Sequence, residues 1–298
     1  MRAARYHEYG DPTVLRIEDA PEVHAQPGSI RIRTLAVSVN PVDWKLRAGL
    51  AREVMPLEFP VIPGRDAAGY VDEVGEGVTD VAVGDLVFGM GGLQDTSAEF
   101  AVLSAWAPVP ENWTVEQAAA AGLAATTAVP ALAALGELSG RTLVVDGAAG
   151  SVGSAAAVFA VDAGATVIGT AAERNHEYLT SLGVTPVTYG DGLADRIASA
   201  DIALDTAGHG SLPDLIAITG SADRVVTVAD AAGAAALGVR HESATNDSEA
   251  LRTAARLGAE GRYLPRVATV LPLADIAEAH RLAAAGGNPG KVVLRVAD

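Results

Sequence analysis

A glycine-rich segment between residues 142 and 153 has the residue types and spacing of a phosphate-binding turn. It starts as the apolar run 142–145, continues as Asp-Gly-Ala-Ala-Gly-Ser-Val-Gly, and leads into an alanine-rich stretch that is typical of a helix. A strand, a turn and a helix in this order open a dinucleotide-binding unit, and the helix N-terminus attracts phosphate. The segment therefore predicts that a dinucleotide is bound by Ala148, Gly150, Ser151, Val152 and Gly153.

Two glycines of this segment have separate tasks. Gly150 lets the backbone approach a pyrophosphate, and Gly153 lets the helix pack close to the strand. Ala148 stands where the G-x-G-x-x-G pattern has its first glycine, a small change that is compatible with a tight turn. Because glycine-rich turns between strands and helices are common, the prediction depends on the next strand along the chain.

The next apolar run, 166–170, indicates which dinucleotide to expect. NAD-preferring sites usually have Asp or Glu at the end of this strand, to hold the ribose hydroxyls. Here Ala171 lies at that place, eighteen residues after Gly153, and Arg174 comes shortly after. A guanidinium pairs with a 2′-phosphate, whereas a carboxylate repels it. We therefore expect NADPH, with Arg174 at its 2′-phosphate; the alternative is a solvated Arg174 and a ribose role for Glu173.

Composition and charge limit the other possibilities. The 298 residues have room for two domains, and hydrophobic residues make up 49% of them. The net charge of −16 argues against nucleic acid or an anionic membrane as the main partner. There are no cysteines, which excludes disulfides, thiolate zinc sites and a cysteine nucleophile. The six histidines show no metal-ligand spacing.

The chain has no segment that we expect to cross or enter a membrane. Its first residues lack the apolar core of a signal peptide. The most hydrophobic long stretch, 118–135, is mostly alanine and is broken by Gly122 and Pro130, so we expect a packed helix. These features predict a cytoplasmic protein.

The chain changes character near residue 114. Before it, alternating or glycine-bounded apolar runs predict short strands at 29–37, 70–78 and 85–89. Thr114 and Gln117 form a capping-box pattern that begins a helix. Apolar runs then alternate with helical stretches, which is typical of a parallel sheet covered by helices; these runs are 142–145, 166–170, 186–189, 201–205, 223–228 and 238–241.

The C-terminal part returns to the β-rich style, with strands expected at 266–270 and 291–296 and a helix at 276–285. We therefore predict an α/β protein in which a Rossmann-type nucleotide-binding domain, residues 114–261, is inserted in a β-rich catalytic domain. The catalytic domain consists of residues 1–113 and 262–298.

Several segments, in this order and spacing, make the chain similar to the medium-chain dehydrogenase/reductase superfamily. Within it, the chain resembles the zinc-independent quinone oxidoreductase branch, the zeta-crystallin-like reductases. The resemblance covers nearly the whole chain and implies a GroES-like catalytic domain. The segments that carry it are 39–49 (VNPVDWKLRAG), 63–71 (PGRDAAGYV), 74–78 (VGEGV), 83–87 (VGDLV), 147–153 and 290–294 (GKVVL).

The resemblance also shows what is missing for zinc chemistry. Zinc-dependent relatives use an early cysteine, a G-H-E-x-x-G segment and a lobe with four cysteines. This chain has Asn40 near the cysteine position and Gly-Arg-Asp-Ala-Ala-Gly at 64–69. Without those ligands, no zinc ion can polarise an alcohol or carbonyl. We therefore expect no metal.

The same resemblance implies roles for individual residues. Asn40 and Thr127 are expected beside the nicotinamide, although Asn40 before a proline is also an ordinary turn residue. Lys45 replaces a tyrosine of many relatives, and it either stabilises an enolate or supplies a proton, or it is simply solvated. The expected cofactor contacts beyond the glycine turn are Thr170, Arg174, Tyr189, Ala207, Ala229 and Lys291.

The predicted activity is hydride transfer from NADPH to a quinone or an α,β-unsaturated carbonyl, because the cofactor carries the difficult step. Two alternatives stay open: an enoyl reductase acting on a biosynthetic intermediate, and a non-catalytic NADPH-binding sensor. The family resemblance implies a homodimer, and the charge disfavours a nucleic-acid partner.

Overall fold

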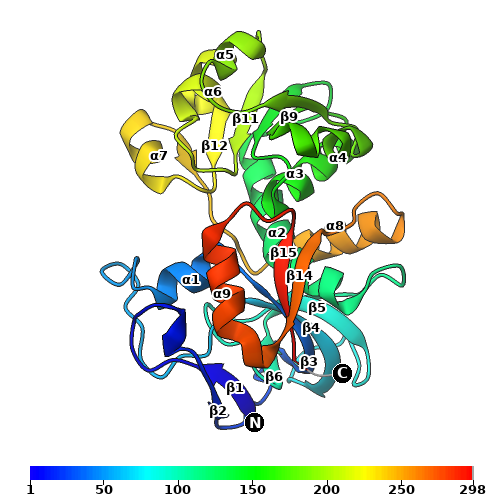
Figure 1. The fold of residues 1–298 in the computed structure, drawn as a ribbon. Coiled ribbons are helices and arrows are strands. Elements are labelled where there is room, and N and C mark those ends of the chain that lie inside the picture. The colour runs from blue at the N-terminus through cyan, green and yellow to red at the C-terminus, as the bar shows by residue number, and fades with distance from the viewer. Residues whose placement is uncertain (297–298) are drawn as a thin grey trace. The chain divides into compact units, whose positions relative to one another are not determined.

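The structure is a computed structural model and describes residues 1–296 (Figure 1). Its internal contacts divide the chain into two units. The first unit contains residues 1–123 and the chain from Asn246 onward, and the second contains residues 124–245. An inserted domain was predicted, but with boundaries at 113/114 and 261/262.

The boundary after residue 245 has a clear cause, because helix α8 (Ser248–Ala259) packs on the first unit. Asn112 Nδ2 donates to the Gly258 carbonyl at 2.7 Å, and the Trp113 indole donates to the Tyr263 carbonyl at 3.2 Å. A Cβ on Gly258 would lie 2.4 Å from the Trp113 ring, so the helix and the ring are in close contact.

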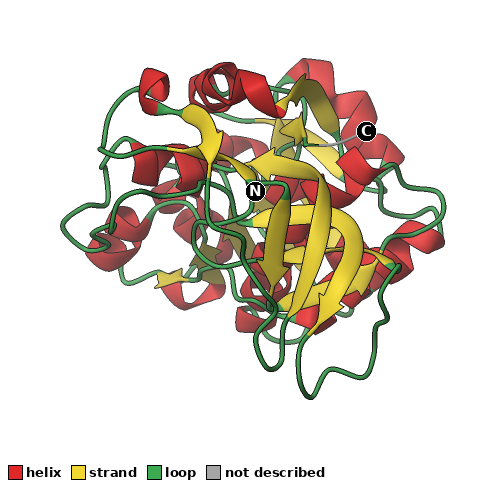
Figure 2. Ribbon diagram, turned by 90° about the horizontal axis from the view of Figure 1, so that it is seen from below, coloured by secondary structure: helices red, strands yellow, loops and turns green. Residues whose placement is uncertain are grey.

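A mixed, mostly antiparallel sheet forms the centre of the first unit, in the order β14-β15-β3-β4-β5-β7, with β6 also paired to β3. Only β14 and β15 run parallel among the pairs of this order within residues 1–296. The sheet is strongly curved (Figure 2). Its strands are β3 (Ile30–Val39), β4 (Asp66–Val74), β5 (Leu86–Met90), β6 (Phe100–Leu103), β7 (Ala105–Pro108), β14 (Val267–Pro272) and β15 (Lys291–Arg295).

The core of this unit lies between the sheet and its covering elements. Buried side chains of the sheet strands, such as Ile30, Ile32 and Val292, pack with Ile276 of α9 (Ile276–Ala285). The unit also contains the antiparallel pair of β1 (Arg2–Arg5) and β2 (Arg16–Asp19), helix α1 (Pro41–Arg47), and the 3-10 helices η1 (Pro12–Val14) and η4 (Leu273–Asp275). The β-rich prediction for both ends of the chain is confirmed.

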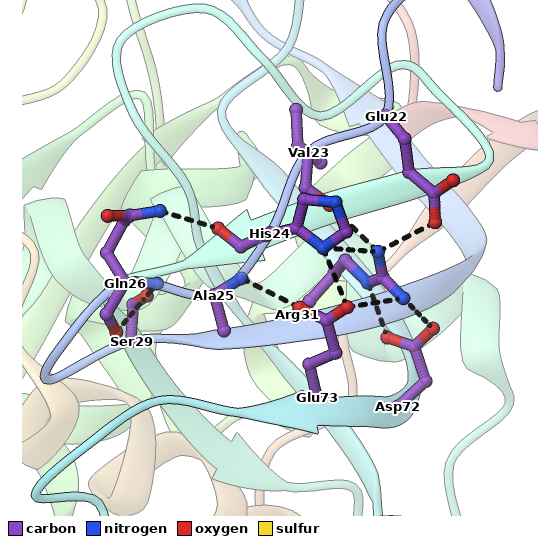
Figure 3. Close-up of polar contacts among 9 residues, drawn as sticks. All are labelled: Glu22, Val23, His24, Ala25, Gln26, Ser29, Arg31, Asp72 and Glu73. Atoms are coloured by element: carbon purple, nitrogen blue, oxygen red, sulfur yellow. Dashed lines mark hydrogen bonds and ion pairs between the residues drawn. The ribbon is translucent and has the colours of Figure 1, made fainter.

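A buried arginine fixes an irregular segment to this sheet (Figure 3). Arg31 of β3 donates to both oxygens of Asp72, at 3.0 and 2.9 Å. It also donates to Glu22 and to the Val23 carbonyl, each at 2.9 Å, and pairs with Glu73. Because a buried guanidinium requires partners for its charge and donors, this set of contacts accounts for the placement of Arg31.

The second unit is built on a parallel sheet with strand order β10-β9-β8-β11-β12-β13. The strands are β8 (Thr142–Asp146), β9 (Thr166–Ala171), β10 (Thr185–Thr188), β11 (Ile202–Asp205), β12 (Val225–Thr227) and β13 (Arg240–His241). The helices between them are α3 (Ser151–Asp162), α4 (His176–Ser181), α5 (Leu193–Arg196), α6 (Leu212–Thr219) and α7 (Ala231–Leu237). This is the Rossmann-type sheet predicted from the alternating pattern.

Helix α2 (Val115–Ala134) contains the boundary between the two units. Its start has the predicted capping box: the Gln117 side chain accepts from the Thr114 N–H at 2.9 Å, and the Thr114 hydroxyl accepts from the Gln117 N–H at 3.3 Å. Within the described residues, α2 is the one helix long and apolar enough to cross a membrane, but 72% of its apolar window is buried in the protein.

Candidate functional site

The glycine turn brings the start of α3 close to the end of β8. Gly147 has φ +78°, a left-handed conformation that favours glycine. A Cβ on Gly153 would lie 2.3 Å from the Gly147 carbonyl oxygen, so only glycine allows this approach. The N-cap residue of α3 is Gly150, which has no side chain, and the described part of the chain supplies no side-chain cap at this helix start. The first N–H groups of α3 are therefore left for an external acceptor, as a phosphate site requires.

Two buried side chains hold this turn in place. The Thr170 hydroxyl donates to the Asp146 carboxylate and accepts from the Gly147 N–H at 3.0 Å. Ser211 donates to the other Asp146 oxygen at 2.6 Å, and the Ala148 N–H donates to the Thr170 carbonyl at 3.0 Å. Thr170 was predicted as a cofactor contact; its side chain is fully buried and fixes the turn. Asp146 and Ser211 were not predicted, although a carboxylate ending a buried strand was a visible signal.

A similar network lies at the carboxyl ends of β11 and β12. One Asp205 oxygen accepts from the N–H groups of Ala207 and Gly208, at 2.8 and 2.9 Å, and the other accepts from the Thr227 hydroxyl at 2.6 Å. A Cβ on Gly208 would lie 3.0 Å from the Cβ of Ala229, so the two turns touch. The structure therefore places the predicted residues Ala207 and Ala229 in two turns that touch, at the edge where parallel sheets bind ligands.

Arg174 and Tyr189 come after neighbouring strands at the same edge. β9 and β10 are parallel, and Ala171 pairs with Thr188, so both chains leave the sheet together. Arg174 is exposed in the short 3-10 helix η2 (Glu173–Asn175), and Tyr189 is 56% exposed. Within residues 1–296, no hydrogen bond or ion pair is found for the Arg174 side chain. This placement leaves a guanidinium and an aromatic ring open to an external ligand.

In the first unit, Asn40 is the centre of a buried polar cluster. Its amide oxygen accepts from the Lys291 ammonium, and its amide nitrogen donates to Asp66 Oδ1 at 3.0 Å. The Ser38 hydroxyl also donates to Asp66 Oδ1, at 2.8 Å, and the other Asp66 oxygen accepts from the Leu123 N–H at 2.9 Å. Asn40 is 0% and Lys291 6% exposed. The structure thus brings together one predicted catalytic residue and one predicted cofactor contact.

Asp43 adds a second carboxyl group to this cluster. One oxygen accepts from the Asn40 N–H at 2.7 Å, and the other is buried without a hydrogen-bond partner among residues 1–296. Burial raises the pKa of Asp43 to about 7; the hydrogen bond from Asn40 and the charge of Lys291 oppose this rise, and the charge of Asp66 adds to it. Burial lowers the pKa of Lys291, while both carboxylates oppose that change.

The other two predicted catalytic residues are Lys45 and Thr127. Lys45 is exposed on α1, with its ammonium 5.7 Å from the centre of the Trp44 ring. Thr127 is buried in the part of α2 that belongs to the second unit. Neither placement tests a catalytic role. Within residues 1–296, no group of three or more His, Cys, Asp or Glu side chains is arranged to hold a metal ion.

Two family models match the chain. An alcohol dehydrogenase GroES-like domain matches residues 26–131, and a zinc-binding dehydrogenase domain matches residues 182–294. The chain belongs to the medium-chain dehydrogenase/reductase superfamily. The resemblance inferred from the sequence motifs is thereby confirmed, and so is the fold that it implied.

Several superfamily members resemble the chain over different lengths. A chloroplast envelope quinone oxidoreductase homolog of Arabidopsis thaliana is 36% identical over 63% of this chain, and the match spans 60% of that relative. Quinone oxidoreductase of Sus scrofa is 28% identical over 99% of this chain and 97% of its own length. The match thus covers less than two thirds of the Arabidopsis relative.

Solved structures of the superfamily have the same fold. The quinone oxidoreductase of Coxiella burnetii superposes with a TM-score of 0.85 at 26% identity, over 100% of this chain and 99% of its own. A mycobacterial protein complexed with NADPH superposes with a TM-score of 0.79 at 26% identity, over 99% of this chain and 100% of its own.

The close approach at Gly153 gives a first prediction. Alanine is the better helix former, by about 1 kcal/mol, but the Cβ of Gly153→Ala would meet backbone atoms at 2.3 and 2.8 Å. Because backbone cannot give way cheaply, we expect Gly153→Ala to lower the free energy of unfolding by about 1–3 kcal/mol. Urea titration of the variant and the wild type measures this difference in the free energy of unfolding.

Gly150→Ala is the matched control for this prediction. Its Cβ would meet a single neighbour, the Gly147 oxygen, at 3.2 Å, and its φ of −75° suits any residue. We expect a loss below about 1 kcal/mol for this variant, the usual size of a change away from close contacts. Equal losses for the two variants would show that the contact at Gly153 is unimportant.

The buried Asp43 carboxyl predicts a pH-dependent stability. Its pKa is raised in the folded protein. The protonated carboxyl group therefore adds to the free energy of unfolding in full below the unfolded pKa of about 4, and this contribution is lost as the pH rises through 7. Between pH 5 and pH 8, the wild type should lose roughly 2–3 kcal/mol of unfolding free energy that Asp43→Asn does not lose. Urea titrations at both pH values measure the difference.

Asp85→Asn provides the comparison within the same unit. Asp85 is an exposed turn carboxylate that accepts from the Ala82 N–H at 2.9 Å. We expect this variant to keep the pH dependence of the wild type. If the unfolding free energies of Asp43→Asn and Asp85→Asn both follow the pH dependence of the wild type, the pKa of Asp43 is not raised in the folded protein.

Proposed function

We propose that this protein is a metal-free, NADPH-dependent oxidoreductase that transfers hydride to a quinone or an α,β-unsaturated carbonyl compound. The observation that carries the proposal is the uncapped start of α3 behind the glycine turn, with Arg174 exposed at the same edge of the sheet. The relatives named quinone oxidoreductase and the NADPH complex of a mycobacterial relative support the same activity and cofactor.

The preference for NADPH depends on charge at the end of β9. The strand ends at Ala171, and no carboxylate occupies that position to bind ribose hydroxyls. Arg174 is exposed three residues later, so its guanidinium is available to a 2′-phosphate. A guanidinium in this position favours a phosphorylated ligand, because it can donate two charge-assisted hydrogen bonds to a phosphate.

The site residues do not fit a catalytic zinc ion. The position near the zinc-binding cysteine of relatives holds Asn40, whose oxygen already accepts from the Lys291 ammonium. The histidine of G-H-E-x-x-G is replaced by Arg65. A buried ammonium and a nearby guanidinium repel a divalent cation, and neither is a metal ligand. The proposed reaction therefore does not use zinc.

The proposed reaction needs little from acidic or basic side chains. Bound NADPH supplies the hydride to the electron-poor carbon of the acceptor, whose oxygen gains the electron pair and takes a proton. Lys45, exposed on α1, is the candidate donor of that proton, and water is the alternative. Asn40 and Thr127 are proposed to lie near the nicotinamide. A cytoplasmic homodimer stays a prediction from the sequence.

The test of the proposed function is oxidation of NADPH and NADH, side by side, with a panel of quinones and conjugated enones. We expect turnover with NADPH to exceed that with NADH at least tenfold, a difference of about 1.4 kcal/mol. The best acceptor would separate a quinone reductase from an enoyl reductase. Tight NADPH binding without turnover on any acceptor would contradict the reductase and favour the sensor.

Arg174→Ala tests the assigned 2′-phosphate contact. We expect the variant to bind NADPH more weakly by about 1–3 kcal/mol, the range for a hydrogen bond to a charged group, and to bind NADH as before. Fluorescence titration of both cofactors measures this. Glu173→Gln is the control for the alternative, since a ribose role for Glu173 predicts weaker binding of both. An equal loss of both cofactors in Arg174→Ala would rule out the 2′-phosphate contact.

A further inference from the structure

The residues of the loop that carries Tyr189 do little to order its backbone. It connects β10 to the four-residue helix α5 and reads Tyr-Gly-Asp-Gly at 189–192. Gly190 and Gly192 have φ values of +101° and +74°. Glycine has the largest backbone freedom of all residues, so a loop with two glycines in four positions is costly to order.

Arg196 supplies the missing support. Its Nε donates to the Thr188 carbonyl at 3.1 Å, its Nη1 to the Asp191 carbonyl at 2.7 Å, and its Nη2 to the Gly190 carbonyl at 2.8 Å. One planar guanidinium therefore holds carbonyl groups on both sides of Tyr189. No ion pair to Arg196 is found in the part of the chain that the structure describes, so its donors serve this loop.

The strand before this loop and the helix after it also fix where Tyr189 lies. Thr188 pairs with Ala171 across the parallel strands, which places Tyr189 beside the segment that leads to Arg174. Leu193, the first residue of α5, is 1% exposed and anchors the far end of the loop in the core. Arg196 thus connects an anchored helix to an otherwise unsupported turn.

From these contacts we infer that Arg196 is a positioning residue for the adenosine end of the cofactor, acting through the Tyr189 loop; this inference rests on the proposed function. A loop that is ordered before binding does not lose its conformational freedom when the ligand arrives. The side chain acts on the loop backbone, so its effect is the same for ligands with and without a 2′-phosphate. Arg174, in contrast, acts on that phosphate alone.

The experiment compares dissociation constants of NADPH and NADH for the wild type, Arg196→Met and Arg174→Ala, by fluorescence titration. Methionine keeps much of the aliphatic stem and removes all donors. We expect Arg196→Met to weaken both cofactors by the same factor, about 5–30-fold, which corresponds to 1–2 kcal/mol. The NADPH/NADH ratio should stay at the wild-type value, whereas Arg174→Ala should lower it.

A double-mutant cycle with Tyr189→Ala tests whether Arg196 acts through Tyr189. If the loop is the connection, Arg196→Met should have little further effect on binding once Tyr189 is absent. Fully additive losses would overturn the positioning role. A loss confined to NADPH would overturn it as well, since it would show that Arg196 acts as a charge on the 2′-phosphate.

Arg224→Gln is the matched control. Arg224 also donates to a backbone carbonyl, that of Thr219 at 3.0 Å, but it precedes β12 and so lies at the opposite edge of the sheet. Arg224→Gln should leave the dissociation constants of NADPH and NADH unchanged.

Urea titration of each variant distinguishes a loss of cofactor binding from a loss of folding stability. If the wild type binds neither cofactor, the proposed function itself fails; if it binds both and the cycle is additive, only the role of Arg196 fails.

Discussion

The second unit depends on how closely α3 approaches β8 at the glycine turn. At Gly153 the helix and the turn are separated by less than the space a methyl group needs. This contact fixes where α3 begins and where its first N–H groups point. Asp146 and Thr170 then lock the turn from the side of the sheet, so the geometry is set before any ligand binds.

The cations discussed above are placed differently in the two units. In the first, the buried cations Arg31 and Lys291 have partners that share their charge or accept their hydrogen bonds. In the second, Arg174 is exposed, and Arg196 directs its donors to neutral carbonyls. The first arrangement stabilises a fold, while the second leaves positive charge at one edge of a sheet. On our proposal, this exposed positive charge serves a phosphorylated ligand.

Sequence reasoning succeeded where the signal was local. The glycine turn, the Thr114–Gln117 cap and the helix at 276–285 are each set by neighbours along the chain, and each is confirmed. The cluster around Asn40 was not foreseen, because Lys291 is 251 residues away and only the pairing of β3 with β15 brings the two together. The loop contacts of Arg196 were missed for another reason: an exposed arginine in a polar stretch looks solvated until its donors are traced.

The Asn40 cluster also limits what chemistry the first unit can contribute. The Lys291 ammonium donates to the Asn40 amide oxygen, and the charges of Asp66 and Asp43 favour its protonated form, whereas a catalytic metal keeps an open position for a substrate oxygen. If Asn40 turned toward a ligand, the buried Lys291 ammonium would lose the amide oxygen that accepts its hydrogen bond, which is costly for a buried charge. On our proposal, Asn40 holds the shape of the site beside the nicotinamide, and NADPH supplies the electrons of the reaction. Zinc-dependent members of the superfamily activate the substrate with a metal ion on the same fold. On our proposal, this protein uses that fold for hydride transfer to acceptors that need no such activation.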